Sequence, residues 1–195
     1  MPAGIRRGFA IEVGQSDINA IRDSASITEL RAEELESRGR MDAERGREAM
    51  RLREEAARGY ESAGFLMSAG FNYSKAAKDA YILFERRRSL ENRRKALKCF
   101  DKIDSQENAA FSLIFYGEMA IRLGRKAKEK RERDFYTGTG MSAIEEAGKR
   151  IIRHRLQIGR GRWVLLDMYG EEKQRWDGDQ SLVPREEFWR GHDGY

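Results

Sequence analysis

The 195-residue sequence has no long hydrophobic run, two prolines, two histidines and a single cysteine. A helix that crosses a bilayer needs about 20 consecutive apolar residues, and the longest apolar run, around residues 111–116, is far shorter. We therefore expect no transmembrane segment. Cys99 cannot form an internal disulfide, and such a sequence is typical of a reducing compartment. We expect a cytoplasmic protein, and the scarcity of proline leaves few positions that forbid helix.

The scarcity of histidine and cysteine also argues against enzymatic chemistry. Nucleophilic catalysis needs a base beside the nucleophile, but His154 lies among arginines and His192 lies near the C-terminus. No cysteines or histidines cluster at metal-ligand spacing. The glycine-containing segments 137–140 and 159–161 lack the strand and lysine of a phosphate-binding loop. We expect a protein that is not an enzyme and needs no metal or cofactor.

Charged residues are abundant and unevenly placed. They make up 36% of the chain against 39% hydrophobic residues, a balance that suits a thin stack of helices better than a thick globule. Residues 59–103 hold 10 basic and 5 acidic side chains, and residues 120–162 hold 13 and 5. Residues 163–195 hold 4 and 8, so the sequence predicts a basic helical middle and an acidic tail.

The pattern along the chain divides it into three parts. Residues 1–27 carry scattered glycines, and we expect an irregular N-terminal lead-in. A helical domain is predicted over residues 28–158, with a helix starting near Thr28, turns at 70–74, 104–108 and 137–140, and a last helix over 141–156. Residues 159–195 contain all three tryptophans and form a tail that docks on the helices or on a partner.

Within this domain, residues 57–88 and 95–125 combine small residues and aromatics at helical spacing. They resemble the tetratricopeptide repeat, with Gly64 at the family's glycine of the first helix and Ala76 at the alanine that opens the second. Gly64 and Gly117 are 53 residues apart, which is not a multiple of the family's 34-residue repeat, so the array would be degenerate. The resemblance implies an all-α fold of antiparallel helix pairs stacked as a short TPR-like array. Stacks of longer helices would satisfy the same pattern.

The resemblance also implies a protein–protein interaction adaptor or scaffold whose concave face binds a peptide or helix of another protein. Basic side chains would select an acidic surface or peptide. The candidate partner-binding residues in the helical domain are Arg93, Arg94, Lys98, Lys126 and Arg131. One alternative is an RNA- or ribosome-associated protein whose basic clusters neutralise phosphates. Another is a structural subunit of a larger assembly.

Trp163, Trp176 and Trp189 are the candidate contacts of the acidic tail, spaced 13 residues apart. Large aromatics with one polar group suit partly buried docking positions. Tryptophan is also frequent among the residues that dominate the affinity of protein interfaces. We favour docking of the tail on the chain's own helices over contact with a partner.

Overall fold

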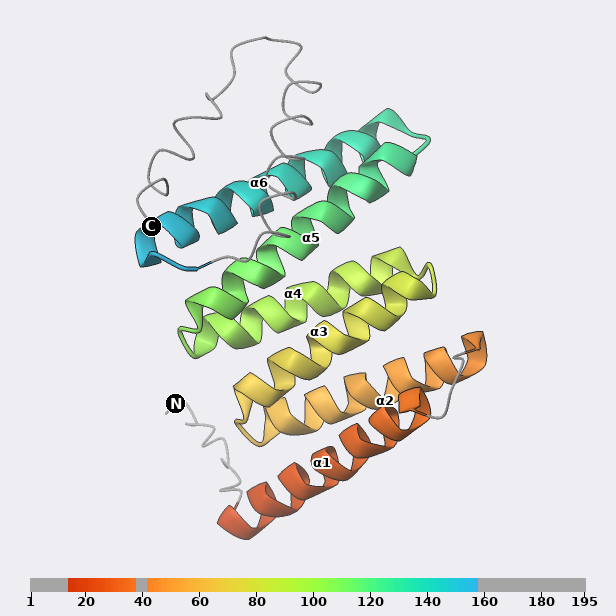
Figure 1. Cartoon of the computed structure of the whole chain (residues 1–195), viewed down its shortest axis with the longest axis vertical. Helices are drawn as coiled ribbons and strands as arrows, with labels where there is room; N and C mark the ends of the chain where they lie inside the picture. The colour runs from red at the N-terminus through yellow and green to blue at the C-terminus, as the bar shows by residue number, and fades with distance from the viewer. Residues whose placement is uncertain (1–13, 38–41, 158–195) are drawn as a thin grey trace, which may run out of the picture.

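The computed structural model describes residues 14–37 and 42–157, and these form six helices with no strand among them (Figure 1). The helices are α1 (Gln15–Ser37), α2 (Ala43–Ser62), α3 (Leu66–Ile82), α4 (Arg86–Lys102), α5 (Gln106–Lys126) and α6 (Lys130–His154). The predicted all-α class is confirmed.

The helices lie in chain order, and each packs mainly against the helix before it and the helix after it. Figure 1 shows them as a zigzag from α1 to α6, with successive helices running in opposite directions and the turns alternating between two edges. Antiparallel packing of consecutive helices, as predicted, is confirmed. Inner helices are covered on two sides, whereas the end helices α1 and α6 each have one neighbour in the described part of the chain.

Three of the turns repeat at intervals of 20 residues. Gly64, Phe84 and Asp104 each adopt a left-handed backbone, with φ of 82°, 61° and 54°. In each turn the next residue donates its N–H to a carbonyl five residues back, at 2.8 Å in the first two turns and 2.9 Å in the third. This is the usual way of satisfying the last carbonyls of a helix. Two helices with their turns therefore span about 40 residues here, not 34.

The core follows the same 20-residue period and is made largely of alanine. Ala56, Ala76 and Ala96 occupy matching positions on α2, α3 and α4 and are fully buried. Alanine leaves little side chain between two helices, so their backbones approach closely. Larger buried side chains such as Phe100 and Ile114 fill the remaining space. A chain with a modest hydrophobic content thereby obtains a continuous core.

Glycine makes the closest seam, between α5 and α6. A Cβ added to Gly117 would lie 2.4 Å from Ile144 Cγ1, and one added to Gly140 would lie 2.7 Å from the Gly117 carbonyl oxygen. Residues 137–140 therefore belong to α6, and the predicted loop there is wrong. These glycines were interpreted as a turn signal, but Gly140 serves close helix packing instead. The turn lies earlier, between Lys126 and Lys130.

Other predicted boundaries also need correction. Helix α1 begins at Gln15, so the start near Thr28 and the irregular lead-in are wrong for residues 15–27. The predicted turn at 70–74 lies inside α3, where Gly70 allows the Phe100 ring to pack closely against the helix. Gly64 is in a turn and not on a helix, so the register of the tetratricopeptide comparison at this position is wrong. Residues 1–13, 38–41 and 158–195, which include the tail, lie outside the described residues.

The α5–α6 seam generates a paired prediction. Replacing Gly140 with alanine should lower the free energy of unfolding by about 1–3 kcal/mol, because the new Cβ overlaps the α5 backbone. Replacing Gly138 with alanine should raise it by about 0.5–1 kcal/mol, because no atom lies within 4 Å of its Cβ position and alanine favours helix. Urea unfolding followed by circular dichroism measures both. Equal effects of the two substitutions would contradict the seam.

Candidate binding surface

Arg93 stands out among the predicted partner-binding residues because it is partly buried and forms no ion pair with the residues that the structure describes. It projects from α4, and its guanidinium carbon lies 4.7 Å from the ring centroid of Phe115 on α5. No hydrogen bond or ion pair joins it to another described residue. Burial lowers the pKa of Arg93 to about 10, and the charge of Glu118 opposes this only in part. The side chain is thus a cation at neutral pH, stacked on an aromatic ring.

The repeat of the fold provides an internal comparison for Arg93. Arg53, 40 residues earlier, occupies the matching position on α2 and forms ion pairs with Glu36 of α1 and with Asp79 of α3, the latter at 2.6 Å. The residue on α5 that matches Asp79 is Met119, which is buried. The same helix position therefore carries an ion-paired guanidinium in α2 and, in α4, one that pairs with no carboxylate among the described residues.

The acidic side chains nearest to Arg93 on α3 and α5 are paired with other cations. Glu118, one turn beyond Phe115 on α5, is ion-paired to Arg122 at 2.6 Å. The Arg122 Nε is itself buried without a partner. On α3 the only acid is Asp79, which Arg53 engages. None of these carboxylates forms an ion pair with Arg93.

The other predicted residues are exposed and are not brought together with Arg93. Arg94 and Lys98 lie one turn apart on α4, and neither forms an ion pair within the described residues. Lys126 is the last residue of α5, and Arg131 is in the first turn of α6. The tail residues Trp163, Trp176 and Trp189 lie outside the described residues.

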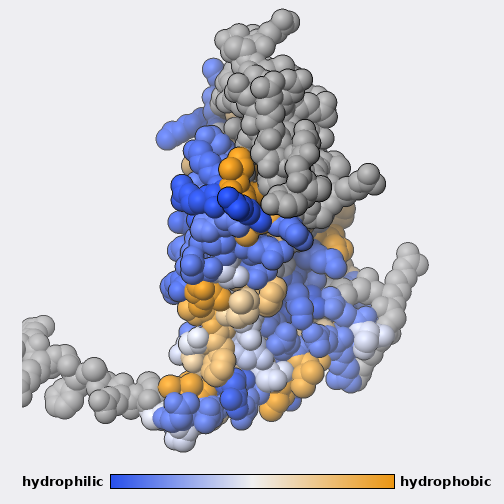
Figure 2. Space-filling view, turned by 60° about the vertical axis from the view of Figure 1, so that its left-hand side comes forward, coloured by the Kyte–Doolittle hydropathy of each residue, from blue (hydrophilic) through white to orange (hydrophobic). Residues whose placement is uncertain are grey.

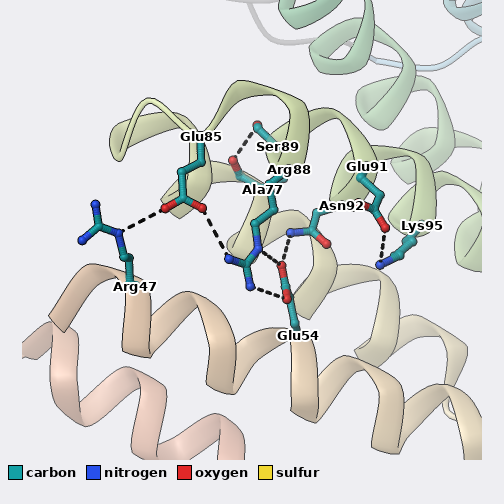
Figure 3. A network of polar contacts seen from close by, with 9 residues as sticks. All are labelled: Arg47, Glu54, Ala77, Glu85, Arg88, Ser89, Glu91, Asn92 and Lys95. Atoms are coloured by element: carbon teal, nitrogen blue, oxygen red, sulfur yellow. Dashed lines mark hydrogen bonds and ion pairs between the residues drawn. The ribbon is translucent and has the colours of Figure 1, made fainter. Parts of the chain in front are cut away.

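Several cations of the predicted basic clusters are neutralised within the chain (Figure 3). Arg88 donates to both oxygens of Glu54 at 2.8 and 2.9 Å, which links α4 directly to α2. Lys95 pairs with Glu91 at 2.9 Å. Arg87 pairs with Glu132 at 2.8 Å, and Arg150 pairs with Asp101 and with Glu146. These pairs reduce the charge left for phosphates, so they lend no support to a nucleic-acid surface.

Glu54 is the centre of this network and is nearly buried. In Figure 3 it points from α2 toward α4, where Asn92 also donates to it at 2.7 Å. Burial acts to raise the pKa of Glu54, but the hydrogen bonds from Arg88 and Asn92 and the charges of Arg88 and Lys95 outweigh it, so the pKa is lowered. The carboxylate is therefore held in its charged form.

A different surface is formed by the turn between α3 and α4. Phe84 is 80% exposed, although it adopts a left-handed backbone in which Gly64 and Asp104 stand in the matching turns. Ile82 beside it is 59% exposed. The two border a pocket of about 270 Å³ whose other lining residues are Asp42, Ala43, Gly46, Arg47, Asp79 and Leu83. We name Ile82, Phe84 and this pocket the Phe84 corner.

Hydrophobic residues also gather at the opposite edge. Figure 2 brings forward the edge with the α2–α3 and α4–α5 turns, and orange residues interrupt its hydrophilic surface. The exposed apolar residues of the elements at this edge are Phe65, Met67, Phe71 and Ile103, which are 36–44% exposed. Phe71 packs edge-on against Phe100 at 5.4 Å, and Arg22 lies over the Phe65 ring. Phe84 is about twice as exposed as any of these residues.

Reactive groups are not assembled in the described part of the chain. Cys99 is buried, and burial together with the charge of Glu61 raises the pKa of its thiol to about 11. His154 is exposed at the end of α6. No group of three or more histidine, cysteine or acidic side chains in residues 14–37 and 42–157 could hold a metal ion. None of the helices described is both long enough and apolar enough to cross a bilayer.

Sequence reasoning identified Arg93 as one cation in a cluster but missed Phe115 as its partner and missed the Phe84 corner. The 20-residue spacing of Ala56, Ala76 and Ala96 is the signal in the sequence that indicates this repeat. It also aligns Arg93 with Arg53. The search for a 34-residue repeat obscured this shorter period.

The Glu54 network generates a prediction about acid stability. Glu54→Gln should lower the free energy of unfolding at pH 7 by about 1–3 kcal/mol, because Arg88 loses its charged partner. Since the pKa of Glu54 is lowered by folding, this contribution is present above the ordinary pKa of about 4.3 and is lost as the pH falls through the folded-state value. The difference between wild type and variant should therefore shrink below about pH 4.

Chemical unfolding across this pH range provides the measurement, and Glu55→Gln provides the control. Glu55 is the next residue on α2 and is exposed, with a longer ion pair of 3.4 Å to Arg51. A Glu54→Gln deficit that stayed constant down to pH 3 would contradict the assigned role of the charge.

No protein-family model matches this chain, and neither the curated proteins nor the solved structures compared with it include a significant match.

Proposed function

We propose that this protein is a non-enzymatic interaction scaffold that binds another protein through its helical array. The observation that carries the proposal is the Phe84 corner. A large aromatic side chain is 80% exposed on a backbone with φ of 61°, which glycine, asparagine or aspartate would adopt at lower cost. The fold gains little from Phe84, so its benefit is expected to lie in an intermolecular contact.

The chemistry of the corner indicates the kind of partner. An exposed aromatic beside a pocket suits an apolar side chain of a partner, because such anchors dominate the affinity of protein interfaces. Arg47 lines the pocket and is largely exposed, although it also pairs with Glu85 at 3.2 Å, and Arg86, with no ion pair among the described residues, follows Phe84 in the chain. Acidic residues next to the partner's apolar anchor would complement these cations. We therefore propose a partner with an acidic surface or peptide.

Phe84→Gly tests this proposal because it removes the aromatic ring and suits the backbone. The variant should be as stable as wild type or more stable by up to about 1 kcal/mol, since glycine is the preferred residue in a left-handed helix cap. It should lose a defined protein that wild type co-purifies from native lysate after nuclease treatment. Thermal unfolding and quantitative mass spectrometry of the bound proteins are the two measurements.

Phe135→Ala is the matched control, because Phe135 is another exposed phenylalanine, 65% accessible, but lies on the helix α6. It should retain the partner. A partner set that is the same for wild type and Phe84→Gly would reject the Phe84 corner as the binding surface. If untreated lysate yields only nucleic acid with the protein, and nuclease treatment removes it, the result would favour the RNA-associated alternative.

A further inference from the structure

We propose that Arg93 is the docking point for the chain's own acidic C-terminal segment, residues 171–179. A carboxylate of this segment would pair with the Arg93 guanidinium, and Trp176 would pack against the aromatic residues of α5 beside it. This proposal does not depend on the Phe84 corner, which lies at the α3–α4 turn.

The first argument is the comparison of matching positions. Arg53 satisfies its charge with two carboxylates, from α1 and α3, whereas Arg93 has an aromatic ring and no carboxylate among the described residues. An arginine that is withdrawn from water and unpaired is unfavourable, and a bidentate carboxylate is its best complement. The vacant position therefore fits an acidic ligand.

The second argument is the chemistry beside Arg93. Phe115 holds one face of the guanidinium, and Phe111 lies parallel to Phe115 with ring centroids 6.3 Å apart. A ligand that carries an aromatic group next to a carboxylate matches this arrangement, because aromatic rings stack on one another and on guanidinium planes.

The third argument is the composition and attachment of the segment. Residues 163–195 hold 8 acidic and 4 basic side chains. Within residues 171–179, Trp176 lies among four acidic side chains and two basic ones, Lys173 and Arg175, and Asp177 and Asp179 follow it. The segment begins shortly after α6, which packs on α5, the helix that carries Phe115. Covalent attachment gives such a segment an effective concentration that a separate acidic peptide reaches only at about millimolar levels. The tail is thus the favoured source of the carboxylate.

Tryptophan fluorescence of the full chain tests the proposal directly, because all three tryptophans lie in residues 163–189 and none lies in the helices described. The background variant Trp163→Phe with Trp189→Phe leaves Trp176 as the single reporter. In this background, low salt should give a short-wavelength emission maximum and weak quenching by acrylamide. Raising the salt to about 1 M, where the screening length falls to about 3 Å, should shift the emission to longer wavelength.

Arg93→Glu in this background should give the long-wavelength emission and stronger quenching already at low salt. Arg94→Glu is the control, since it makes the same charge change at the next, exposed position of α4 and should leave the emission unchanged. Asp177→Asn with Asp179→Asn should reproduce the effect of Arg93→Glu without altering the helices. This second variant decides the result if Arg93→Glu fails to fold by circular dichroism.

Three outcomes would overturn the proposal. If neither Arg93→Glu nor the Asp177/Asp179 variant changes the emission, the segment does not dock on Arg93. The carboxylate partner of Arg93 would then have to come from another protein. An equal response to Arg94→Glu would indicate general charge attraction without a docking point. Protection of Trp176 that depends on protein concentration would place the segment on a second copy of the chain.

Discussion

Close approach of neighbouring helices, through seams of alanine and glycine, is the constraint on which the rest of the structure depends. Ala56, Ala76 and Ala96 are fully buried at matching positions, and Gly117 faces Gly140 across the α5–α6 seam. Small residues leave the backbones near one another, so a chain with 39% hydrophobic residues can bury a continuous core. As a result, few large apolar side chains remain on the surface. Those that remain exposed, Phe84 above all, therefore need an explanation beyond folding.

Ion pairs provide the second level of order, because they join helices that the seams do not. Glu54 of α2 holds Arg88 and Asn92 of α4, and Arg150 of α6 holds Asp101 of α4. Lys75, Arg87 and Lys102 also form ion pairs between helices. Arg93 is an exception to the repeat, since its matching residue Arg53 pairs with two carboxylates and Arg93 pairs with none among the described residues. The exception is informative because the fold repeats.

The sequence was sufficient to predict the helical class, the consecutive antiparallel packing and the boundaries near the α4–α5 turn. Helix-forming composition and a period of about 3.6 residues carry that information locally. It was insufficient for residues 137–140, because glycine favours turns in isolation but also permits close packing, and only the neighbouring helix decides between the two. It was also insufficient for residues 15–27, which contain no glycine but follow the glycine-bearing residues 1–14. For the binding surface, Arg93 was predicted from charge alone. Its importance depends on Phe115 and on the missing acid, which are tertiary features.

A photo-reactive phenylalanine analogue at position 84, introduced into the full chain in the cell that produces it, most directly tests the claim that this array is an interaction scaffold. After irradiation, the account predicts a covalent adduct with one defined protein from position 84 and no such adduct from position 135, which is also exposed but lies on α6. Absence of an adduct at position 84, or the same adducts from both positions, would contradict it.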